Sequence, residues 1–453
     1  MVAYHYRRNI RTCLQTSFFL LKSRLMPDCS TASNHKIHEL CRITAEKSRE
    51  AAIQLATISG EQRAACLRVA ADTIRKDEAD ILKANLQDLA AAPGFGLTEA
   101  ATDRLRLDSE RIEAIAAGIE AVAALPDPIG ELIETSTQPN GLQVRKVRVP
   151  LGVIFFIYES RPNVTADAAA VAMASGNAVI LRGGKEAAYS SRRIVESIRQ
   201  AISVSGLPTD CVQLVNIADR EAVGAFLQFD NLIDLAIPRG GEGLIRRVCA
   251  EARMPVLKHF SGNCHVYVDK SADLDMAERI LIDAKCQRMG VCNAAESLLV
   301  HGSVAQEFLP RVAEQLRSRN VDMLGDKATR EILPEVGLAT ESDFATEFLG
   351  PKLSIGVVRS IDEAIKHINQ FGSRHTDAIV TSEESVAERF AAQVDTAVIL
   401  VNASTRFNDG GELGLGAEIG ISTDKLHARG PCGPRELTTY KYVVMGNGQT
   451  KGL

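Results

Sequence analysis

The sequence has no excess of positive charge, no long apolar stretch and no closely paired cysteines. Its formal net charge of −5 at pH 7 argues against the basic surface that nucleic-acid binding requires. Apolar stretches such as residues 17–21 and 151–158 are far shorter than the roughly 20 residues that span a bilayer. We therefore predict a protein that binds neither nucleic acid nor membrane.

The ten cysteines contain no C-x-x-C pair and do not form the pattern of a disulfide framework. This favours a reducing compartment, so we predict a cytoplasmic protein in which one activated thiolate can act as a nucleophile. The 45% hydrophobic and 24% charged residues are typical of a globular protein. Because 453 residues are too many for one core, we expect two or three domains.

The first 25 residues carry no acidic side chain and five basic ones, Arg7, Arg8, Arg11, Lys22 and Arg24. Such a segment is either a transit peptide or a stretch upstream of the working start codon, with Met26 as the start. We treat residues 1–33 as an extension, disordered or untranslated, and leave them out of the fold prediction.

The rest of the chain predicts an α/β fold with two parallel-sheet domains and a projecting β-hairpin. Helical periodicity covers residues 38–92 and 108–124, and extended residues 132–137 and 142–149 flank a Pro-Asn-Gly turn. Short apolar strands then alternate with helices, which predicts parallel sheets covered on both faces, with ligands at the carboxyl ends of the strands. The predicted strands are residues 153–157, 178–181, 212–215, 232–237, 256–258, 265–269, 297–301, 354–358, 378–381, 398–401 and 437–445. The helices that alternate with them are residues 164–174, 190–204, 220–229, 243–252, 273–285 and 304–317.

Two glycine-rich turns each follow a predicted strand and precede a predicted helix. They are Arg182, Gly183, Gly184 and Lys185 in the first turn, and Arg239, Gly240 and Gly241 in the second. Such turns let backbone N–H groups approach phosphate oxygens, although neither matches G-x-G-x-x-G and both are also compatible with ordinary tight turns. Arg182 and Lys185 place two cations where a 2′-phosphate would bind, which favours NADP over NAD.

Cys292 lies in a loop between a predicted helix and a predicted strand. Gly290 permits an unusual backbone path that would aim a thiolate at a carbonyl carbon. A lone cysteine in such a loop is more often structural. From residue patterns alone, the prediction therefore stops at a multi-domain α/β protein with a candidate nucleotide site.

Longer segments carry a family resemblance. They include Tyr158-Glu159-Ser160-Arg161-Pro162-Asn163-Val164-Thr165, Gly372-Ser373-Arg374-His375-Thr376-Asp377, Val401-Asn402-Ala403-Ser404-Thr405-Arg406-Phe407 and Leu426-His427-Ala428-Arg429-Gly430-Pro431. Over residues 36–449 the chain resembles the γ-glutamyl phosphate reductase family of the aldehyde dehydrogenase superfamily.

The resemblance implies an aldehyde dehydrogenase-like fold and an oxidoreductase. Its reaction would be the NADPH-dependent reduction of L-glutamyl 5-phosphate to L-glutamate 5-semialdehyde and phosphate, the second step of proline biosynthesis. A separate glutamate 5-kinase would supply the substrate, because the N-terminal region is too short for a kinase domain. The implied domains are residues 34–131 and 150–263 for NADPH binding, residues 264–430 for catalysis, and residues 132–149 and 431–453 as an oligomerisation hairpin and terminal strand of a homo-oligomer.

By the same resemblance, Cys292 attacks the γ-acyl carbon and carries the acyl group as a thioester. Asn163, with the backbone N–H of Cys292, stabilises the oxyanion. Glu347 matches a superfamily residue that contacts the nicotinamide ribose, although Leu349 replaces an aromatic residue of that motif. The candidates for binding the substrate phosphate and α-carboxylate are Arg161, Arg406, His427 and Arg429. No metal site is expected.

One departure from the superfamily bears on the reaction. Hydrolytic aldehyde dehydrogenases carry a glutamate in a Glu-Leu-Gly-Gly motif that activates water, and the nearest segment here is His259-Phe260-Ser261-Gly262, without a carboxylate. This favours acyl-phosphate chemistry, although a histidine can also act as a base near pH 7. Two alternatives stay open: a dehydrogenase of another semialdehyde, and a non-catalytic protein of the same fold.

Overall fold

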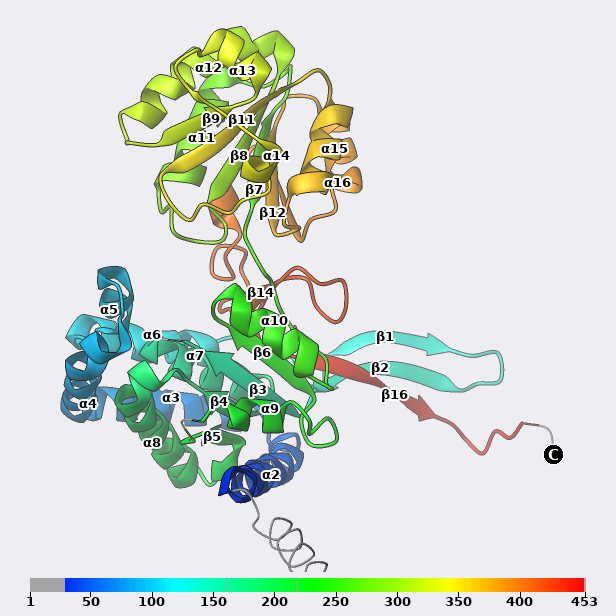
Figure 1. Cartoon of the computed structure of the whole chain (residues 1–453). Helices are drawn as coiled ribbons and strands as arrows, with labels where there is room; N and C mark the ends of the chain where they lie inside the picture. Colours follow the sequence, from blue (N-terminus) through cyan, green and yellow to red (C-terminus); the bar gives the residue numbers. More distant parts are fainter. Residues whose placement is uncertain (1–28, 160, 218, 452–453) are drawn as a thin grey trace, which may run out of the picture.

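The structure, a computed structural model, describes residues 29–159, 161–217 and 219–451. Figure 1 shows two α/β units, one above the other, and a narrow antiparallel sheet that projects sideways from the lower unit. The predicted pair of parallel-sheet units is confirmed. Among the described helices, none is both long and apolar enough to cross a membrane.

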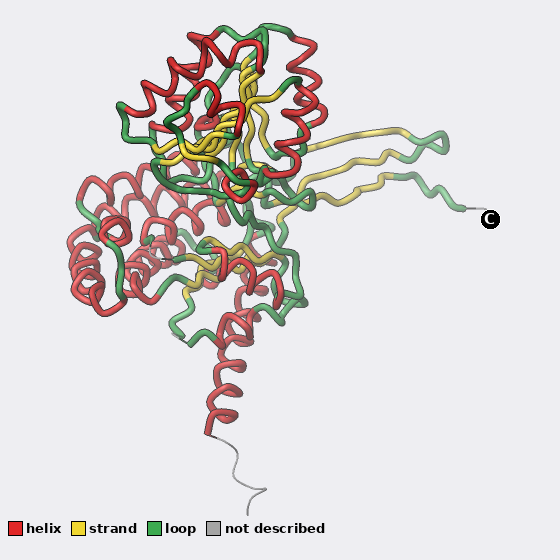
Figure 2. The backbone as a smooth tube through the Cα atoms, turned by 45° about the horizontal axis from the view of Figure 1, so that its top comes forward, coloured by secondary structure: helices red, strands yellow, loops and turns green. Residues whose placement is uncertain are grey.

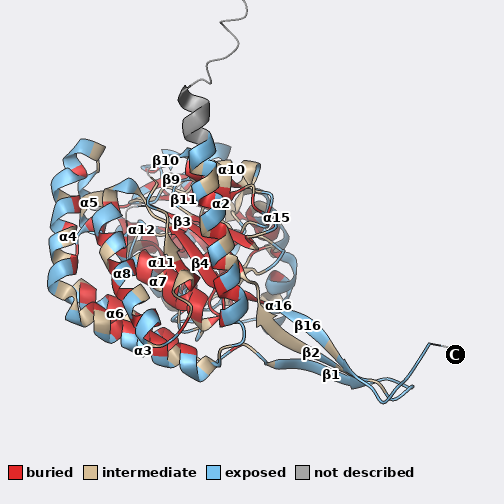
Figure 3. Cartoon of the chain, turned by 90° about the horizontal axis from the view of Figure 1, so that it is seen from below, coloured by how far each residue is buried: buried red, intermediate tan, exposed pale blue. Residues whose placement is uncertain are grey.

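The lower unit is built on a parallel sheet with the strand order β5-β4-β3-β6. The strands are β3 (Val153–Tyr158), β4 (Ala178–Arg182), β5 (Val212–Leu214) and β6 (Leu235–Arg239). All of β3 is buried, which explains its unbroken apolar sequence (Figure 3). Around this sheet lie α7 (Pro162–Ala174), η2 (Lys185–Ala187), α8 (Ala188–Val204), η3 (Thr209–Cys211), α9 (Glu221–Phe226) and α10 (Glu242–Glu251).

An N-terminal helical layer completes this unit. It comprises α2 (Cys29–Leu55), α3 (Gly60–Lys76), α4 (Glu78–Ala91), η1 (Ala92–Phe95), α5 (Glu99–Leu105) and α6 (Ser109–Ala123). A capping box of Ser59 and Gln62 starts α3, and the side chain of Asp108 caps α6. Their apolar faces join the core formed by β3 and β4. Because α2 begins at Cys29, the end of the predicted extension is helical, and residues 1–28 lie outside the described residues.

The upper unit contains a parallel sheet with the strand order β10-β9-β11-β8-β7-β12-β13. Its strands are β7 (Cys264–Val268), β8 (Ala295–His301), β9 (Asp322–Gly325), β10 (Gly337–Leu338), β11 (Lys352–Val358), β12 (Thr376–Val380) and β13 (Val398–Val401). Its helices are α11 (Leu274–Cys286), α12 (Gly302–Arg317), α13 (Lys327–Ile332), α14 (Glu341–Phe344), α15 (Ile361–Phe371), α16 (Glu384–Gln393) and η4 (Thr405–Phe407). Two separate cores show that α11 and α12 cover one face of the sheet, whereas α15 and α16 cover the other.

Two predicted strands differ from those observed. Residues 256–258 do not form a strand: Val256 makes only an isolated bridge with Ala236. The strand predicted at residues 232–237 is β6, which starts later because the N–H groups of Leu232 and Ile233 bond back to the Phe229 carbonyl in a turn.

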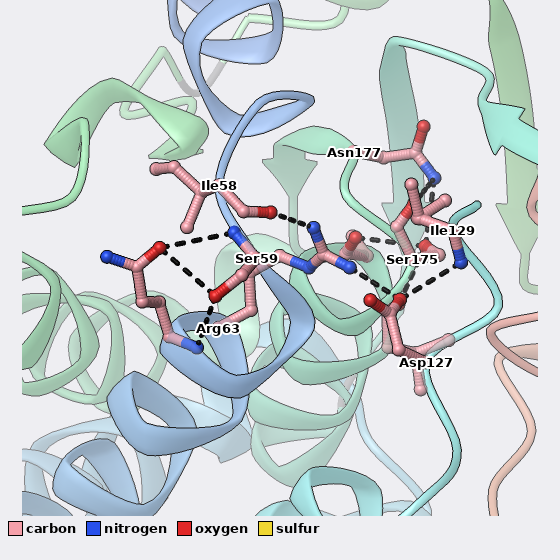
Figure 4. A network of polar contacts seen from close by, with 10 residues as sticks. Ile58, Ser59, Arg63, Asp127, Ile129, Ser175 and Asn177 are labelled. Atoms are coloured by element: carbon pink, nitrogen blue, oxygen red, sulfur yellow. Dashed lines mark hydrogen bonds and ion pairs between the residues drawn. The ribbon is translucent and has the colours of Figure 1, made fainter.

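The projecting sheet has the order β1-β2-β16 and is antiparallel throughout (Figure 2). It joins the predicted hairpin, β1 (Leu132–Thr137) and β2 (Gln143–Pro150), to the terminal strand β16 (Thr438–Met445). Figure 4 shows how its base is attached to α3. The buried Arg63 pairs with Asp127 at 2.5 Å and donates to the Ile58 carbonyl, while Asp127 accepts from the Ile129 N–H.

Asn177 attaches the same base to the first sheet. Its Oδ1 accepts from the Gly152 N–H at 2.7 Å, and its Nδ2 donates to the Leu437 carbonyl at 2.8 Å. Gly152, two residues after β2, and Leu437, the residue before β16, are thereby held by one buried amide. This explains an asparagine at the tight turn that leads into β4.

The chain returns to the lower unit earlier than the sequence indicates. A two-stranded sheet of β14 (Gly420–Ser422) and β15 (Gly430–Cys432) follows the upper unit. Ile419, Cys432 and Leu437 belong to the core of the lower unit. The boundary expected at residue 430 is therefore reached after the chain has already crossed back.

Candidate active site

Cys292 lies in the loop between α11 and β8. A Cβ on Gly262 would be 1.7 Å from the Cys292 carbonyl oxygen, so only glycine fits there. The Cys264 thiol donates to the same carbonyl at 3.1 Å. Gly290, expected to set the path of the loop, does not have a positive φ, and a Cβ there would make only an ordinary contact with the Leu349 carbonyl. Gly262 and Cys264 therefore position the loop, and Gly290 does not.

The Cys292 thiol has a mixed electrostatic environment. Burial raises its pKa to about 11, and the positive charge of Arg239 acts in the opposite direction. The carboxylates of Glu418 and Glu347 raise this pKa further. Arg239, the last residue of β6, is therefore the main side chain that favours the thiolate.

Two imidazoles lie beside this thiol. Ligand-type atoms of His259, Cys292 and His375 all lie within 4.8 Å of one another. Burial lowers the pKa of His259 to about 4 and that of His375 to about 3, and the charge of Arg239 adds to both shifts. Both rings are therefore neutral at physiological pH.

Arginines gather around the thiol. Burial lowers the pKa of Arg161, and so do the charges of Arg239, Arg104 and Arg288. A thiolate at Cys292 acts on Arg161 in the opposite direction. Arg161 follows β3 and Arg239 ends β6, so both stand at the carboxyl ends of parallel strands, where α/β sheets bind ligands. This concentration of positive charge makes the surroundings of Cys292 a candidate anion site.

Asn163, the predicted oxyanion residue, lies in the first turn of α7. Its Nδ2 donates to Asp167 Oδ2 at 3.1 Å, one turn further along the helix. An amide nitrogen has two N–H groups, so this bond fixes the orientation of Asn163 and leaves the second group to donate elsewhere.

We expect Asp167→Asn to stabilise the protein at neutral pH. Burial raises the pKa of Asp167 to about 6, above the value of about 3.9 in an unfolded chain. The folded state therefore binds the extra proton in this window, so stability falls as the pH rises from about 4 through 6 and stays lower above it. At about 1.4 kcal/mol per pKa unit, asparagine should add about 1–3 kcal/mol to the free energy of unfolding near pH 8 and far less near pH 4.

Denaturant titrations at the two pH values measure this difference. The exposed Asp230→Asn is the matched control and should change stability at neither pH. A gain from Asp167→Asn that is equal at both pH values would contradict the assignment.

A carboxylate oxygen lies against the backbone of the second glycine turn, and another lies close to the first. Glu159 Oε2 accepts from the Gly241 N–H at 3.0 Å, at the start of α10, and a Cβ on Gly240 would lie 2.6 Å from the Glu159 carboxyl carbon. A Cβ on Gly184 would lie 2.5 Å from Glu186 Oε2. The Gly241 N–H thus binds an anionic oxygen, as a phosphate site requires, whereas at the first turn only the close approach of the Glu186 carboxylate is observed.

Two cations flank the first turn. Arg182 ends β4 and donates to the Gly183 carbonyl, and Lys185 Nζ lies 4.9 Å from the centre of the Phe95 ring. Glu347, the one predicted cofactor contact outside the two turns, accepts from the Gly262 N–H at 2.8 Å, and burial raises its pKa. Gly262 lies against Cys292, so Glu347 is close to the thiol. A cofactor bound to Glu347 would therefore also lie close to the thiol.

The predicted substrate residues separate into two groups. Arg161 interacts electrostatically with Cys292, and Arg406 donates to Asn293, the neighbour of Cys292, and to Gln287 at 2.9 Å. His427 bonds instead to the Glu436 carbonyl at 2.6 Å. Arg429 pairs with Asp395 at 2.9 Å. Within the described residues, no contact brings His427 or Arg429 to the thiol.

Sequence reasoning missed three features of this site. It placed Arg239 in the cofactor turn but did not predict that its side chain also acts on Cys292, although its position at the end of a parallel strand was the available signal. It gave no role to His375, which precedes β12 and which no spacing links to Cys292. Gly262 was noted only as part of a motif, and no sequence pattern indicated that the Cys292 carbonyl leaves no room for a larger residue at this position.

Comparisons with known proteins agree along nearly the whole chain. The aldehyde dehydrogenase family model matches residues 26–331 and 339–416. The chain is 57% identical over 412 residues to a γ-glutamyl phosphate reductase of Rhodopirellula baltica, which covers 91% of this chain and 95% of that protein. It is 51% identical over 406 residues to the γ-glutamyl phosphate reductase of Moorella thermoacetica, with 90% and 97% covered.

A solved structure has the same architecture. The γ-glutamyl phosphate reductase of Thermotoga maritima matches with a TM-score of 0.89 at 44% identity, over 91% of this chain and 99% of that one. These likenesses confirm the resemblance drawn from the sequence motifs. The chain is an oxidoreductase of the aldehyde dehydrogenase family, which uses a nicotinamide cofactor, and within that family it belongs to the γ-glutamyl phosphate reductases.

Proposed function

We propose that the chain reduces L-glutamyl 5-phosphate with NADPH to L-glutamate 5-semialdehyde and phosphate, the second step of proline biosynthesis from glutamate. The observation that carries the proposal is the Cys292 thiol beside Arg161 and Arg239, with histidine instead of a carboxylate at residue 259. A cysteine among cations suits an acyl substrate whose leaving group is an anion. The names of the relatives point to the same substrate.

In this reaction the Cys292 thiolate attacks the γ-acyl carbon. A carbon–sulfur bond forms, and the bond between the acyl carbon and the phosphate oxygen breaks, so that phosphate leaves with the electron pair. Arg239 stabilises the thiolate before attack, and with Arg161 it compensates the charge of the departing phosphate. The amide of Asn163 and the backbone N–H of Cys292 hold the negative charge on the acyl oxygen. NADPH, when bound, would supply the hydride that reduces the thioester carbon. The carbon–sulfur bond then breaks, which releases the semialdehyde and returns Cys292 as the thiolate.

The thioester is protected from hydrolysis because residue 259 is a histidine and carries no carboxylate. His259 is neutral, and its Nδ1 is bonded to the Ile421 carbonyl at 3.1 Å. No carboxylate side chain therefore occupies the position that activates water in hydrolytic relatives. Phosphate is then the natural acceptor of the acyl group in the reverse reaction.

We assign the cofactor to the lower unit, residues 34–131 and 150–263, and the nucleophile to the upper unit, which begins at residue 264 and ends before the chain crosses back to the lower unit near Ile419. The residues assigned to the phosphates and the ribose are Arg182, Gly183, Gly184, Lys185, Arg239, Gly240, Gly241 and Glu347. The support is the hydrogen bond from the Gly241 N–H to the Glu159 carboxylate at the second turn and the two cations at the first. Arg182 and Lys185 would bind the 2′-phosphate that distinguishes NADPH from NADH.

For the substrate α-carboxylate we assign Arg406 ahead of His427 and Arg429. Arg406 is bonded to the residue after Cys292, whereas the other two are engaged with Glu436 and Asp395. The eight cysteines from Cys41 to Cys432 are unpaired, which suits the reducing cytoplasm, where a glutamate 5-kinase would supply the acyl phosphate.

The reverse reaction tests the proposed function. We expect reduction of NADP⁺ by glutamate 5-semialdehyde to require inorganic phosphate. Turnover without phosphate would instead indicate a hydrolytic aldehyde dehydrogenase. Absence of turnover under both conditions would exclude this substrate.

We also propose that the three-stranded sheet joins subunits of a homo-oligomer. It projects from the body of the molecule and exposes Leu132, Tyr440, Tyr442 and Val444, the last two by 61% and 52%. Alternate residues of a strand share a face, so Tyr440, Tyr442 and Val444 form one apolar stripe on β16. Such a stripe on an edge strand of a monomer would promote aggregation.

The double variant Tyr442→Glu/Val444→Glu is therefore expected to dissociate the oligomer, because it places two charges in the exposed stripe that the subunit interface would bury. Sedimentation velocity would show a lower mass for this variant and an unchanged mass for Thr439→Glu, an exposed control on the opposite face of β16. A monomeric parent protein, or an unchanged mass in the double variant, would contradict the assignment.

A further inference from the structure

The group formed by His259, Cys292 and His375 has the composition of a metal site. Two imidazole nitrogens and one thiol sulfur lie within 4.8 Å of one another. In a tetrahedral zinc site such atoms are about 3.3–3.7 Å apart. Side-chain rotations that move the ligand atoms by about 1 Å would therefore place all three within bonding distance of one ion. The residues come from three distant segments, which is why no sequence spacing indicated a metal site.

The imidazoles are oriented as metal-bound histidines are. His259 Nδ1 is bonded to the Ile421 carbonyl at 3.1 Å, and His375 Nδ1 is bonded to Thr376 Oγ1 at 2.7 Å. Metal-ligating histidines almost always use their second ring nitrogen in this way. In each ring, Nε2 is therefore the atom left for a ligand.

His375 supplies an independent indication of a missing partner. The residue is fully buried, and its Nε2 has no hydrogen-bond partner among the residues that the structure describes. A buried polar atom without a partner is costly, and in native structures it usually has a water molecule or an ion beside it. A metal ion between His375 and Cys292 would satisfy this nitrogen.

We propose that His259, Cys292 and His375 form a Zn²⁺ site that captures the nucleophile and reversibly inhibits the enzyme. Zn²⁺ prefers thiolate and imidazole ligands, and three protein ligands leave a fourth position for water. On binding, the sulfur–hydrogen bond of Cys292 is replaced by a sulfur–zinc bond, and the proton is released to solvent. The metal is not oxidised or reduced.

The surrounding charges act in both directions. Arg239 and Arg161 are positive and oppose a cation, whereas Glu418 and Glu347 are acidic groups that act on the same thiol and favour one. The inhibitory consequence depends on the proposed role of Cys292 as the nucleophile. Metal binding itself does not depend on that role.

Titration of the purified chain with Co²⁺ tests the site without any turnover. We expect one Co²⁺ per chain with a near-ultraviolet thiolate-to-cobalt charge-transfer band and visible bands of tetrahedral intensity. Zn²⁺ should displace it. Cys292→Ser should abolish the charge-transfer band. His259→Asn and His375→Asn should each weaken binding by about 100-fold or more, beyond the 10- to 100-fold that loss of a supporting hydrogen bond costs.

Two matched variants control for the other thiols and histidines. Cys286→Ser removes a partly buried cysteine of α11, and His301→Asn replaces a histidine that caps α12 with another capping residue. Both should leave the cobalt spectrum unchanged. Circular dichroism checks that His375→Asn folds, and His259→Asn tests the same ligand set independently.

Absence of the bands in the parent protein would overturn the proposal, and so would bands that survive in Cys292→Ser. In the phosphate-dependent assay, Zn²⁺ should inhibit the parent protein, and a chelator should restore its activity. A cobalt spectrum that depends on Cys292 without inhibition by Zn²⁺ would support the metal site but overturn its inhibitory role, and would count against Cys292 as the nucleophile.

Discussion

Replacing Cys292 with serine is expected to lower the rate of phosphate-dependent semialdehyde oxidation by on the order of 10⁶-fold, the loss seen when a covalent nucleophile is removed. The hydroxyl group keeps the shape of the thiol, but it does not ionise at physiological pH and forms an ester instead of a thioester. The cofactor turns lie in the other unit. The affinity for NADPH, measured by fluorescence titration, should therefore change by less than about threefold, within the usual ±0.5 kcal/mol of a distant substitution.

A loss of rate without a loss of NADPH affinity would show that the substitution affects the chemical step and not the folding of the protein. Cys286→Ser, six residues earlier in the chain and also partly buried, serves as the control and should retain activity. Residual activity of Cys292→Ser near that of the control would mean that another group carries the acyl chain. A parallel loss of NADPH binding would indicate a structural defect instead.

Replacing Arg239 with glutamine is expected to lower kcat/KM for the acyl substrate by on the order of 10³-fold. A hydrogen bond to a charged group contributes about 1.5–3 kcal/mol, or about 10- to 150-fold in rate, and loss of the phosphate contact accounts for this part. The remainder comes from the thiolate, because Arg239 is the main positive charge that lowers the pKa of Cys292. Alkylation of Cys292 by iodoacetamide, which needs no substrate, should slow down as well.

Arg239→Lys keeps the positive charge and should restore alkylation more fully than turnover, because lysine cannot bind phosphate through two parallel hydrogen bonds. Arg253→Gln, at an exposed arginine beyond α10, is the matched control and should leave both rates unchanged. If Arg239→Gln keeps kcat/KM within about threefold of the parent value, Arg239 does not have the role assigned to it.

The sequence predicts the elements of this fold well where apolar periodicity is strong. The buried strands β3 and β4 and the amphipathic helix α8 were placed within one or two residues. Residues 256–258 were assigned wrongly because an apolar stretch at a sheet edge has the same pattern as a strand, and only its hydrogen bonds distinguish the two. The return of residues 417–437 to the lower unit was missed for a similar reason, since these small and apolar residues have no periodicity of their own.

The candidate site was likewise predicted only in part. Cys292 and Asn163 came from family-like motifs, which extend over adjacent residues and can be recognised in one dimension. The approach of His375 to Cys292 depends instead on sheet order. The loop before β8 and the start of β12 come together because β7 lies between these two strands, with His265 of β7 opposite Asp377. Such a meeting of distant segments leaves no signal in a single sequence.

The acyl-enzyme itself gives the most direct test of the proposed mechanism. The chain would be mixed with glutamate 5-semialdehyde and NADP⁺ without phosphate, quenched in acid and analysed by intact-protein and peptide mass spectrometry. We predict one glutamyl group per chain, attached to the peptide that contains Cys292, and its disappearance when phosphate is added before the quench. An unmodified protein that has nevertheless reduced NADP⁺, or a glutamyl group on another cysteine, would contradict the thioester route through Cys292.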